Sequence, residues 1–267
     1  MLSRVWNTVQ GWREKRTLAQ RAIPDALWAD TRMRYPFLAE LDDDDAGRLR
    51  TLATLFLARK QFHGTHGLEV SDAMAVAIAA QACLPILNLG LDWYDGFVGI
   101  VVHPDEMVAQ REVMDEDGVV HEYEEVLAGE ALEGGPVTLS WRDVEDAAES
   151  ADWGYNVVIH EFAHVIDMRD GEADGIPPLP GREAHLAWRR VLDASYERFC
   201  DEVDRGEETL IDPYGAEAPG EFFAVACETF FVSAPDLLEW DPQLYALLRG
   251  FFAQDPAARF AFGLSAD

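Results

Sequence analysis

The chain has 267 residues, of which 49% are hydrophobic and 11% aromatic, so it is long enough to bury a large core. Its 50 acidic side chains outnumber 21 basic ones and give a formal net charge of −29. A charge of that sign and size repels nucleic acid and anionic lipid, so the composition argues against direct binding to DNA, RNA or a membrane surface.

The charge is unevenly distributed along the chain. Residues 1–60 carry a net charge near +3, whereas the remainder is near −32. We expect residues 1–40 to form a basic helical arm and residues 41–267 to form the main domain. The arm either docks on the acidic body as an amphipathic helix or contacts a partner.

The cysteines and the N-terminus indicate a cellular compartment. Cys83, Cys200 and Cys227 are odd in number and far apart, with no C-x-x-C spacing, so they predict small core residues and not disulfides or a thiolate metal site. The first twenty residues contain no apolar segment typical of a secretory signal. We therefore expect a cytoplasmic protein in a reducing environment.

One apolar stretch, residues 73–91, has the length of a membrane span. Gln81, Pro85 and Asn88 interrupt it, and acidic residues flank it, which is unfavourable for a membrane helix. Ser71 is a good helix N-cap and Pro85 is a helix stop. The stretch therefore predicts a buried helix of about twelve residues.

Strand patterns come first along the rest of the chain, and helical patterns follow. Strands are expected at 97–102, at 111–114 and 119–127 around an Asp117–Gly118 turn, and at 137–141; helices are expected at 46–59, 142–150, 153–168, 183–203, 219–232 and 244–252. This order predicts an α+β fold, with a small, mostly antiparallel sheet followed by a C-terminal helical half.

The segment NVVIHEFAHVID contains the motif H-E-x-x-H, formed by His160, Glu161 and His164. On a helix the two histidines lie one turn apart on the same face, so both imidazoles can reach one divalent ion. Glu161 then lies beside the ion, where its carboxylate can take a proton from metal-activated water. The remaining positions are apolar, so this active-site helix is expected to be buried.

A catalytic zinc site usually has three protein ligands, so one more is needed. Glu183 stands nineteen residues after His164, a spacing similar to that of thermolysin-like enzymes, and Glu221 stands fifty-seven residues after it. Spacing alone does not separate these two candidates.

Four blocks of the sequence resemble one known family. They are KQFHGTHGLEVSDAMAVAIAAQACLPIL, GGPVTLSW, NVVIHEFAHVIDMRDGEADGIPPLP and DPYGAEAPGEFFAVACETFF. The chain resembles the Mlc titration factor A family of bacterial cytosolic zinc peptidases, whose catalytic core is similar to that of anthrax lethal factor. The resemblance covers about residues 55–255 and implies a zincin-like metallopeptidase core.

The resemblance also implies a role for individual residues. His160, His164 and Glu221 would be the ligands of one Zn²⁺ per chain, Glu161 would be the general base, and Tyr214 would donate its phenol to the oxyanion. It further implies aminopeptidase-like hydrolysis of short peptides and association with a transcriptional repressor of sugar uptake.

Two more carboxylates are candidates for supporting the ligands. Metal-bound imidazoles usually donate their other N–H to a carboxylate or a carbonyl. Asp167 lies one turn after His164 on the same helix face, and Glu228 lies two turns after Glu221. We expect Asp167, and less directly Glu228, to accept such a bond. The strand at 137–141 is expected to be a sheet edge that pairs with the substrate backbone.

Three hypotheses therefore remain for the function. The first is a zinc-dependent aminopeptidase-like metallopeptidase. The second is a non-catalytic protein that sequesters a repressor and whose zinc is mainly structural. The third is a thermolysin-like peptidase that uses Glu183 as its third ligand.

Overall fold

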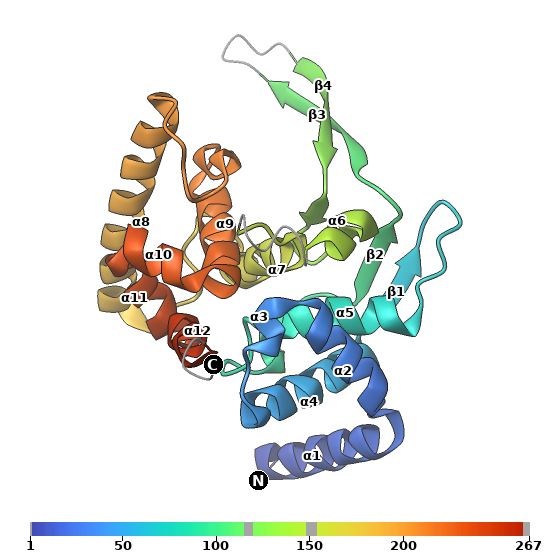
Figure 1. Ribbon diagram of the computed structural model, residues 1–267. Helices are drawn as coiled ribbons and strands as arrows, with labels where there is room; N and C mark the ends of the chain where they lie inside the picture. The colour runs from blue at the N-terminus through green and yellow to red at the C-terminus, as the bar shows by residue number, and fades with distance from the viewer. Residues whose placement is uncertain (1, 115–119, 148–153, 264–267) are drawn as a thin grey trace.

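The computed structural model describes residues 2–114, 120–147 and 154–263 (Figure 1). The α-helices are α1 (Leu2–Arg21), α2 (Asp25–Arg34), α3 (Pro36–Ala39), α4 (Asp43–Arg59), α5 (Asp72–Cys83), α6 (Trp141–Asp146), α7 (Val157–Asp167), α8 (Gly181–Asp204), α9 (Pro219–Val232), α10 (Ala234–Trp240), α11 (Pro242–Phe252) and α12 (Pro256–Gly263). The strands are β1 (Gln61–Gly64), β2 (Gly99–His103), β3 (Met107–Met114), β4 (Val120–Leu127), β5 (Gly129–Ala131) and β6 (Val137–Ser140). Short 3-10 helices are η1 (Leu91–Tyr94), η3 (Met168–Asp170) and η4 (Pro213–Ala216). The α+β class is confirmed.

Local signals placed several helices correctly. Asp42 caps α4 by accepting a hydrogen bond from the backbone N–H of Asp45 at 2.7 Å. Ser71 caps α5 by accepting one from the N–H of Met74, and the helix ends two residues before Pro85. The predicted twelve-residue buried helix is therefore confirmed. Within the described part of the chain, no helix combines the length and apolar character needed to cross a membrane.

The main sheet differs in strand direction from the sequence-based expectation. Its order is β1-β2-β6-β5, and the pairs β1–β2 and β2–β6 are parallel; only β5–β6 is antiparallel. The expectation of a mostly antiparallel sheet was therefore wrong for this sheet. β1 was not among the expected strands, and α5 lies between β1 and β2 in the chain. A helical crossover returns the chain in the same direction, which makes the pair parallel.

The expected hairpin forms outside the main sheet. β3 and β4 pair antiparallel from Met107 opposite Leu127 to Met114 opposite Val120. The ribbon projects away from the helices (Figure 1), and its chain continues directly into β5. The expected Asp117–Gly118 turn lies outside the described residues.

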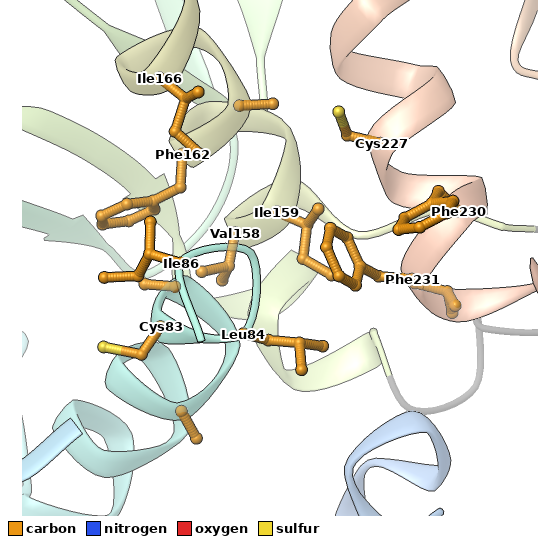
Figure 2. Packing of buried hydrophobic residues seen from close by; sticks show 14 of the residues in the cluster. Cys83, Leu84, Ile86, Val158, Ile159, Phe162, Ile166, Cys227, Phe230 and Phe231 are labelled. Carbon is orange, nitrogen blue, oxygen red and sulfur yellow. The ribbon is translucent and has the colours of Figure 1, made fainter. Parts of the chain in front are cut away.

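Helix α7 lies in the middle of the core, with α5 on one side and α9 on the other (Figure 2). Its Phe162 is fully buried and its ring lies 4.9 Å from Tyr94, 5.8 Å from Phe97 and 5.7 Å from Phe56, centroid to centroid. This aromatic packing anchors α7 in the core. Cys83 and Cys227 are free and buried, as expected, whereas Cys200 is partly exposed.

The C-terminal half is helical, as predicted. α9 occupies the predicted residues, and a proline opens it at a position where the missing N–H costs nothing. Two short helices, α10 and α12, were not predicted; each begins with a proline in its first turn or at its first residue. At the other end, α1 packs on α4, where Glu14 pairs with Arg59 at 2.8 Å.

Candidate metal centre

The two histidines of the motif lie where the helical spacing predicted. Asn156 caps α7 by accepting a hydrogen bond from the N–H of Ile159 at 2.9 Å, so the helix begins at Val157, three residues before His160. His160 and His164 then stand one turn apart with ring centroids 4.8 Å from each other. Their Nε2 atoms are 3.1 Å apart and both rings are largely buried.

The first turn of α9 brings Glu221 to the same point. Its Oε2 lies 3.2 Å from Nε2 of His160 and 3.1 Å from Nε2 of His164. The three residues are the group in the described chain whose ligand atoms are close enough to hold one metal ion. Ligands at about 2.0–2.2 Å from a tetrahedral zinc ion are about 3.3–3.6 Å apart, so the observed separations of 3.1–3.2 Å are within a few tenths of an ångström of those that such an ion needs.

Glu183, the other candidate ligand, lies elsewhere. It is exposed in the first turn of α8 and does not belong to the group of possible metal ligands. The geometry therefore favours Glu221 over Glu183.

The charge state of the three residues follows from their mutual contacts. Burial is the largest single influence and lowers the pKa of His160, but the hydrogen bonds with Glu221 and Glu228 and the nearby carboxylate charges together outweigh it and raise the pKa well above its usual value. Burial raises the pKa of Glu221, but the two histidines hold it well below its usual value. Burial lowers the pKa of His164. The negative charge of the Glu221 carboxylate is thus stabilised by the two imidazoles. A cation bound between the three side chains would be stabilised by the same carboxylate.

Glu161 is buried beside this group, against the edge of the sheet. A β-carbon at Gly129 of β5 would lie 2.6 Å from Cγ and 2.7 Å from Cδ of Glu161, so the strand backbone touches the carboxylate stem. Burial, and after it the carboxylates of Glu221 and Glu228, raises the pKa of Glu161 to about 8. A raised pKa makes the carboxylate a stronger base than an ordinary glutamate and suits it to exchange a proton near neutral pH.

Glu228 contacts the Nδ1 side of the His160 imidazole. Its Oε1 lies 2.8 Å from Nδ1 of His160, and its Oε2 accepts a hydrogen bond from the backbone N–H of Asn156. Its pKa is raised because burial outweighs these contacts. The structure therefore places Glu228 where it can accept the second N–H of a ligand imidazole.

Asp167 is completely buried, but its contact is with the segment that follows α7. Its Oδ2 accepts a hydrogen bond from the backbone N–H of Gly175 at 2.7 Å, whereas its Oδ1 is buried without a hydrogen-bond partner among the described residues. Burial, more than the neighbouring acidic groups, raises its pKa to about 7. The expected bond from a histidine to Asp167 is not among those that the described side chains make.

Tyr214 lies on the open side of the centre. It follows Asp212, whose Oδ1 accepts a hydrogen bond from the N–H of Tyr214 at 2.9 Å and starts η4. Its ring centroid is 6.1 Å from that of His160. The tyrosine ring thus lies near His160 and belongs to the separate 3-10 helix η4.

A cavity of about 170 Å³ opens on this side of the centre. Its lining combines the candidate catalytic groups with apolar side chains and part of the sheet edge: Leu127, Ala128, Gly129, Tyr155, Val157, His160, Glu161, Asp212, Tyr214, Val225 and Glu228. The strand at the edge is β5, not the strand at 137–141. β6 is paired on both sides, so the expectation that it forms the open edge was wrong.

Sequence reasoning missed several residues of this site. Asn156 was recognisable, because an asparagine before an apolar helix is a typical N-cap. No local sequence pattern identifies Gly129 or Tyr155 as part of the site, since their role depends on contacts between segments that are distant in the sequence.

Comparison with known proteins identifies the family of the chain. The family model of the glucose-regulated metallo-peptidase M90 matches residues 9–253. Mlc titration factor A of Edwardsiella ictaluri is 41% identical over 252 residues, which cover 93% of this chain and 94% of that protein. The protein of the same name from Serratia proteamaculans is 40% identical over 263 residues, covering 97% and 95%. Uncharacterized protein slr2042 of Synechocystis is 38% identical over 247 residues, covering 92% and 89%. The resemblance found in the sequence motifs is thus confirmed, and the chain belongs to the M90 family of glucose-regulated metallopeptidases.

Proposed function

We propose that this protein is a zinc-dependent peptidase whose ion is held by His160, His164 and Glu221. The observation that carries the proposal is the convergence of three ligand atoms within 3.2 Å of one another, beside a buried carboxylate and an accessible cavity. Two imidazoles and one carboxylate are a ligand set typical of catalytic zinc. Zinc in such a site polarises the scissile carbonyl and lowers the pKa of water toward neutrality.

The residues around the ion transfer the proton, stabilise the oxyanion and bind the substrate. Glu161 takes the proton of the attacking water and returns it to the leaving amine, first as a base and then as an acid. Tyr214 donates its phenolic O–H to the oxygen on which negative charge develops. The backbone of β5, at the sheet edge along the cavity, offers hydrogen bonds to an extended substrate.

Short peptides, cleaved from their amino end, are the proposed substrates. The cavity of about 170 Å³ is smaller than the roughly 300–1,000 Å³ of sites for drug-sized ligands, which favours a short substrate. The family resemblance supports aminopeptidase-like activity. A panel of chromogenic amino-acid and peptide substrates, with free and blocked amino ends, tests this choice.

The proposal is tested by the variant Glu161→Gln. It should keep one zinc per chain, because residue 161 is not a ligand, and should lose turnover of every peptide in the panel. The exposed Glu183→Gln is the matched control and should keep both zinc and activity. Peptide hydrolysis that survives in Glu161→Gln would contradict the proposed mechanism.

A second proposed function is binding of a transcriptional repressor of sugar uptake. The relatives named Mlc titration factor A support it, since that name states an interaction with Mlc for those proteins. In this case the metal site would serve mainly to hold the structure. If Glu161→Gln still relieves repression in cells, binding is sufficient; if it binds the repressor but does not relieve repression, cleavage is required.

The proposed location is the cytosol. Three free cysteines, two of them buried, suit a reducing compartment. Fractionation of cells that express the chain, with a periplasmic marker as control, tests this assignment.

A further inference from the structure

Gln81 is a buried polar side chain in an otherwise apolar part of α5. It is 0% exposed and its neighbours in the helix are alanine, isoleucine and cysteine. A buried amide requires hydrogen-bond partners. Its Nε2 donates to the carbonyl of Ala77 at 3.2 Å, and its Oε1 accepts from Nδ2 of Asn156 at 2.7 Å. The contact with Asn156 joins α5 to the start of the metal-binding helix.

Asn156 uses both ends of its side chain. Its Oδ1 caps α7 by accepting from the N–H of Ile159 at 2.9 Å, while its Nδ2 donates to Gln81. Serine, threonine and aspartate are also good N-caps, but none of them has an amide that can cap and donate together. The cap alone therefore does not explain the asparagine, whereas the cap and the contact with Gln81 together do.

The same residue continues the chain of contacts toward the metal centre. The backbone N–H of Asn156 donates to Oε2 of Glu228, and Oε1 of Glu228 lies 2.8 Å from Nδ1 of His160. Gln81, Asn156 and Glu228 are each at most 1% exposed, so water does not compete for these bonds. A carboxylate at Nδ1 favours the ring proton on that atom, which would leave the Nε2 lone pair for a metal ion held together with Glu221.

We infer that Gln81 and Asn156 are positioning residues of the metal centre, which hold the Glu228 carboxylate and thereby the tautomer and orientation of the His160 ring. This inference rests on the proposed function of the site. A role confined to packing does not account for Gln81, because an apolar side chain of the same length would fill the same space. Replacing both partners of a buried hydrogen bond by apolar groups of similar shape can be nearly neutral for stability, so packing alone does not require the polar pair.

The test compares Gln81→Met with Thr54→Val in the full-length protein. Gln81→Met keeps the length of the side chain but removes the acceptor for Asn156. Thr54 is also buried, in α4, and its hydroxyl donates to the carbonyl of Arg50 within the same helix, so its isosteric replacement is a matched control. Zinc affinity is measured by competition with a chelator, and the absorption spectrum of the cobalt(II)-loaded protein reports the geometry of the ligands.

We expect Gln81→Met to bind zinc about 10–100-fold more weakly and to change the cobalt spectrum, as is typical when the support of a ligand histidine is lost. Thr54→Val should bind zinc as the wild type does. Gln81→Glu retains an acceptor for Asn156 and should recover the affinity. If Gln81→Met does not fold, the same measurements on Asn156→Ser test the inference, because this variant keeps the helix cap and removes the donor to Gln81.

Equal zinc affinity and an unchanged cobalt spectrum in Gln81→Met and Asn156→Ser would overturn the inference while leaving the proposed function in place. A wild-type chain that takes up no metal would overturn the proposed function, and the inference with it. The two failures are thus distinguishable.

Discussion

Gly129 of strand β5 lies directly against the side chain of Glu161. A β-carbon added at residue 129 would lie 2.6 Å from Cγ and 2.7 Å from Cδ of the glutamate, closer than real β-carbons approach other heavy atoms. The strand backbone and the proposed general base therefore fit together only because residue 129 has no side chain. This contact connects the sheet edge, where we expect the substrate to bind, to the group that moves the proton.

The variant Gly129→Ala should displace the Glu161 carboxylate while leaving the metal ligands in place. A displacement of about 1 Å in an active site can reduce the rate by about 100-fold, so we expect a loss of kcat of that order. Zinc content, measured in the same samples, should remain one per chain. Gly250→Ala is the control, because a β-carbon there meets no atom within 4 Å. Full activity of Gly129→Ala would show that Glu161 does not depend on this contact.

The third ligand is tested by removing each candidate separately. Glu221→Ala should lose zinc, because it removes one of three ligand atoms that lie within 3.2 Å of one another. Glu183→Ala should retain zinc, because this side chain is exposed at the start of α8. Zinc per chain after extensive dialysis is the measurement. Loss of zinc from Glu183→Ala, with retention in Glu221→Ala, would restore the thermolysin-like alternative.

Tyr214→Phe separates catalysis from metal binding. The phenylalanine ring keeps the packing beside His160, but the hydroxyl that we assign to the oxyanion is lost. Removing one such donor typically costs about 10²–10³ in kcat, so we expect a loss of that size with unchanged zinc affinity. Steady-state kinetics and chelator competition measure the two effects. A change in KM alone would assign Tyr214 to substrate binding.

Elements whose ends are set by neighbouring residues were predictable from the sequence. Ser71 and Pro85 define α5, and Pro219 opens α9, because caps and prolines act within one helical turn. The helix of the H-E-x-x-H motif was predicted with its ligand face, although it begins at Val157 and not at Trp153. Asn156 explains this start, since its side chain caps the N–H of Ile159.

Contacts between distant segments were not predictable. Strand β1 has four residues with little apolar alternation, and its partner β2 lies across a helical crossover, so neither its existence nor its direction followed from local pattern. Spacing likewise did not decide whether Glu183 or Glu221 is the third metal ligand, because the length of the intervening chain does not determine which helix returns to the metal site. Residues that support the site, such as Gln81, depend on the same non-local packing.

Asp167 provides a prediction about stability and pH. In the folded protein its pKa is raised from 3.8 to about 7, chiefly by burial, whereas in the unfolded chain the carboxyl ionises near its ordinary value. Between about pH 4 and pH 7 the folded state therefore binds more protons than the unfolded state. The contribution of this group to the free energy of unfolding is fully present below pH 4 and declines as the pH rises to about 7, with a slope of at most about 1.4 kcal/mol per pH unit.

The variant Asp167→Asn removes this dependence, because an amide does not ionise and still offers an oxygen to the N–H of Gly175. The stability of Asp167→Asn relative to the wild type should therefore increase from pH 4 to pH 7. Urea unfolding of both proteins at several pH values, with metal removed, measures the difference, in which the contributions of all other groups largely cancel. Stability curves that stay parallel over this range would show that the folded and unfolded states ionise Asp167 alike, and that its carboxylate has a partner that stabilises the charge.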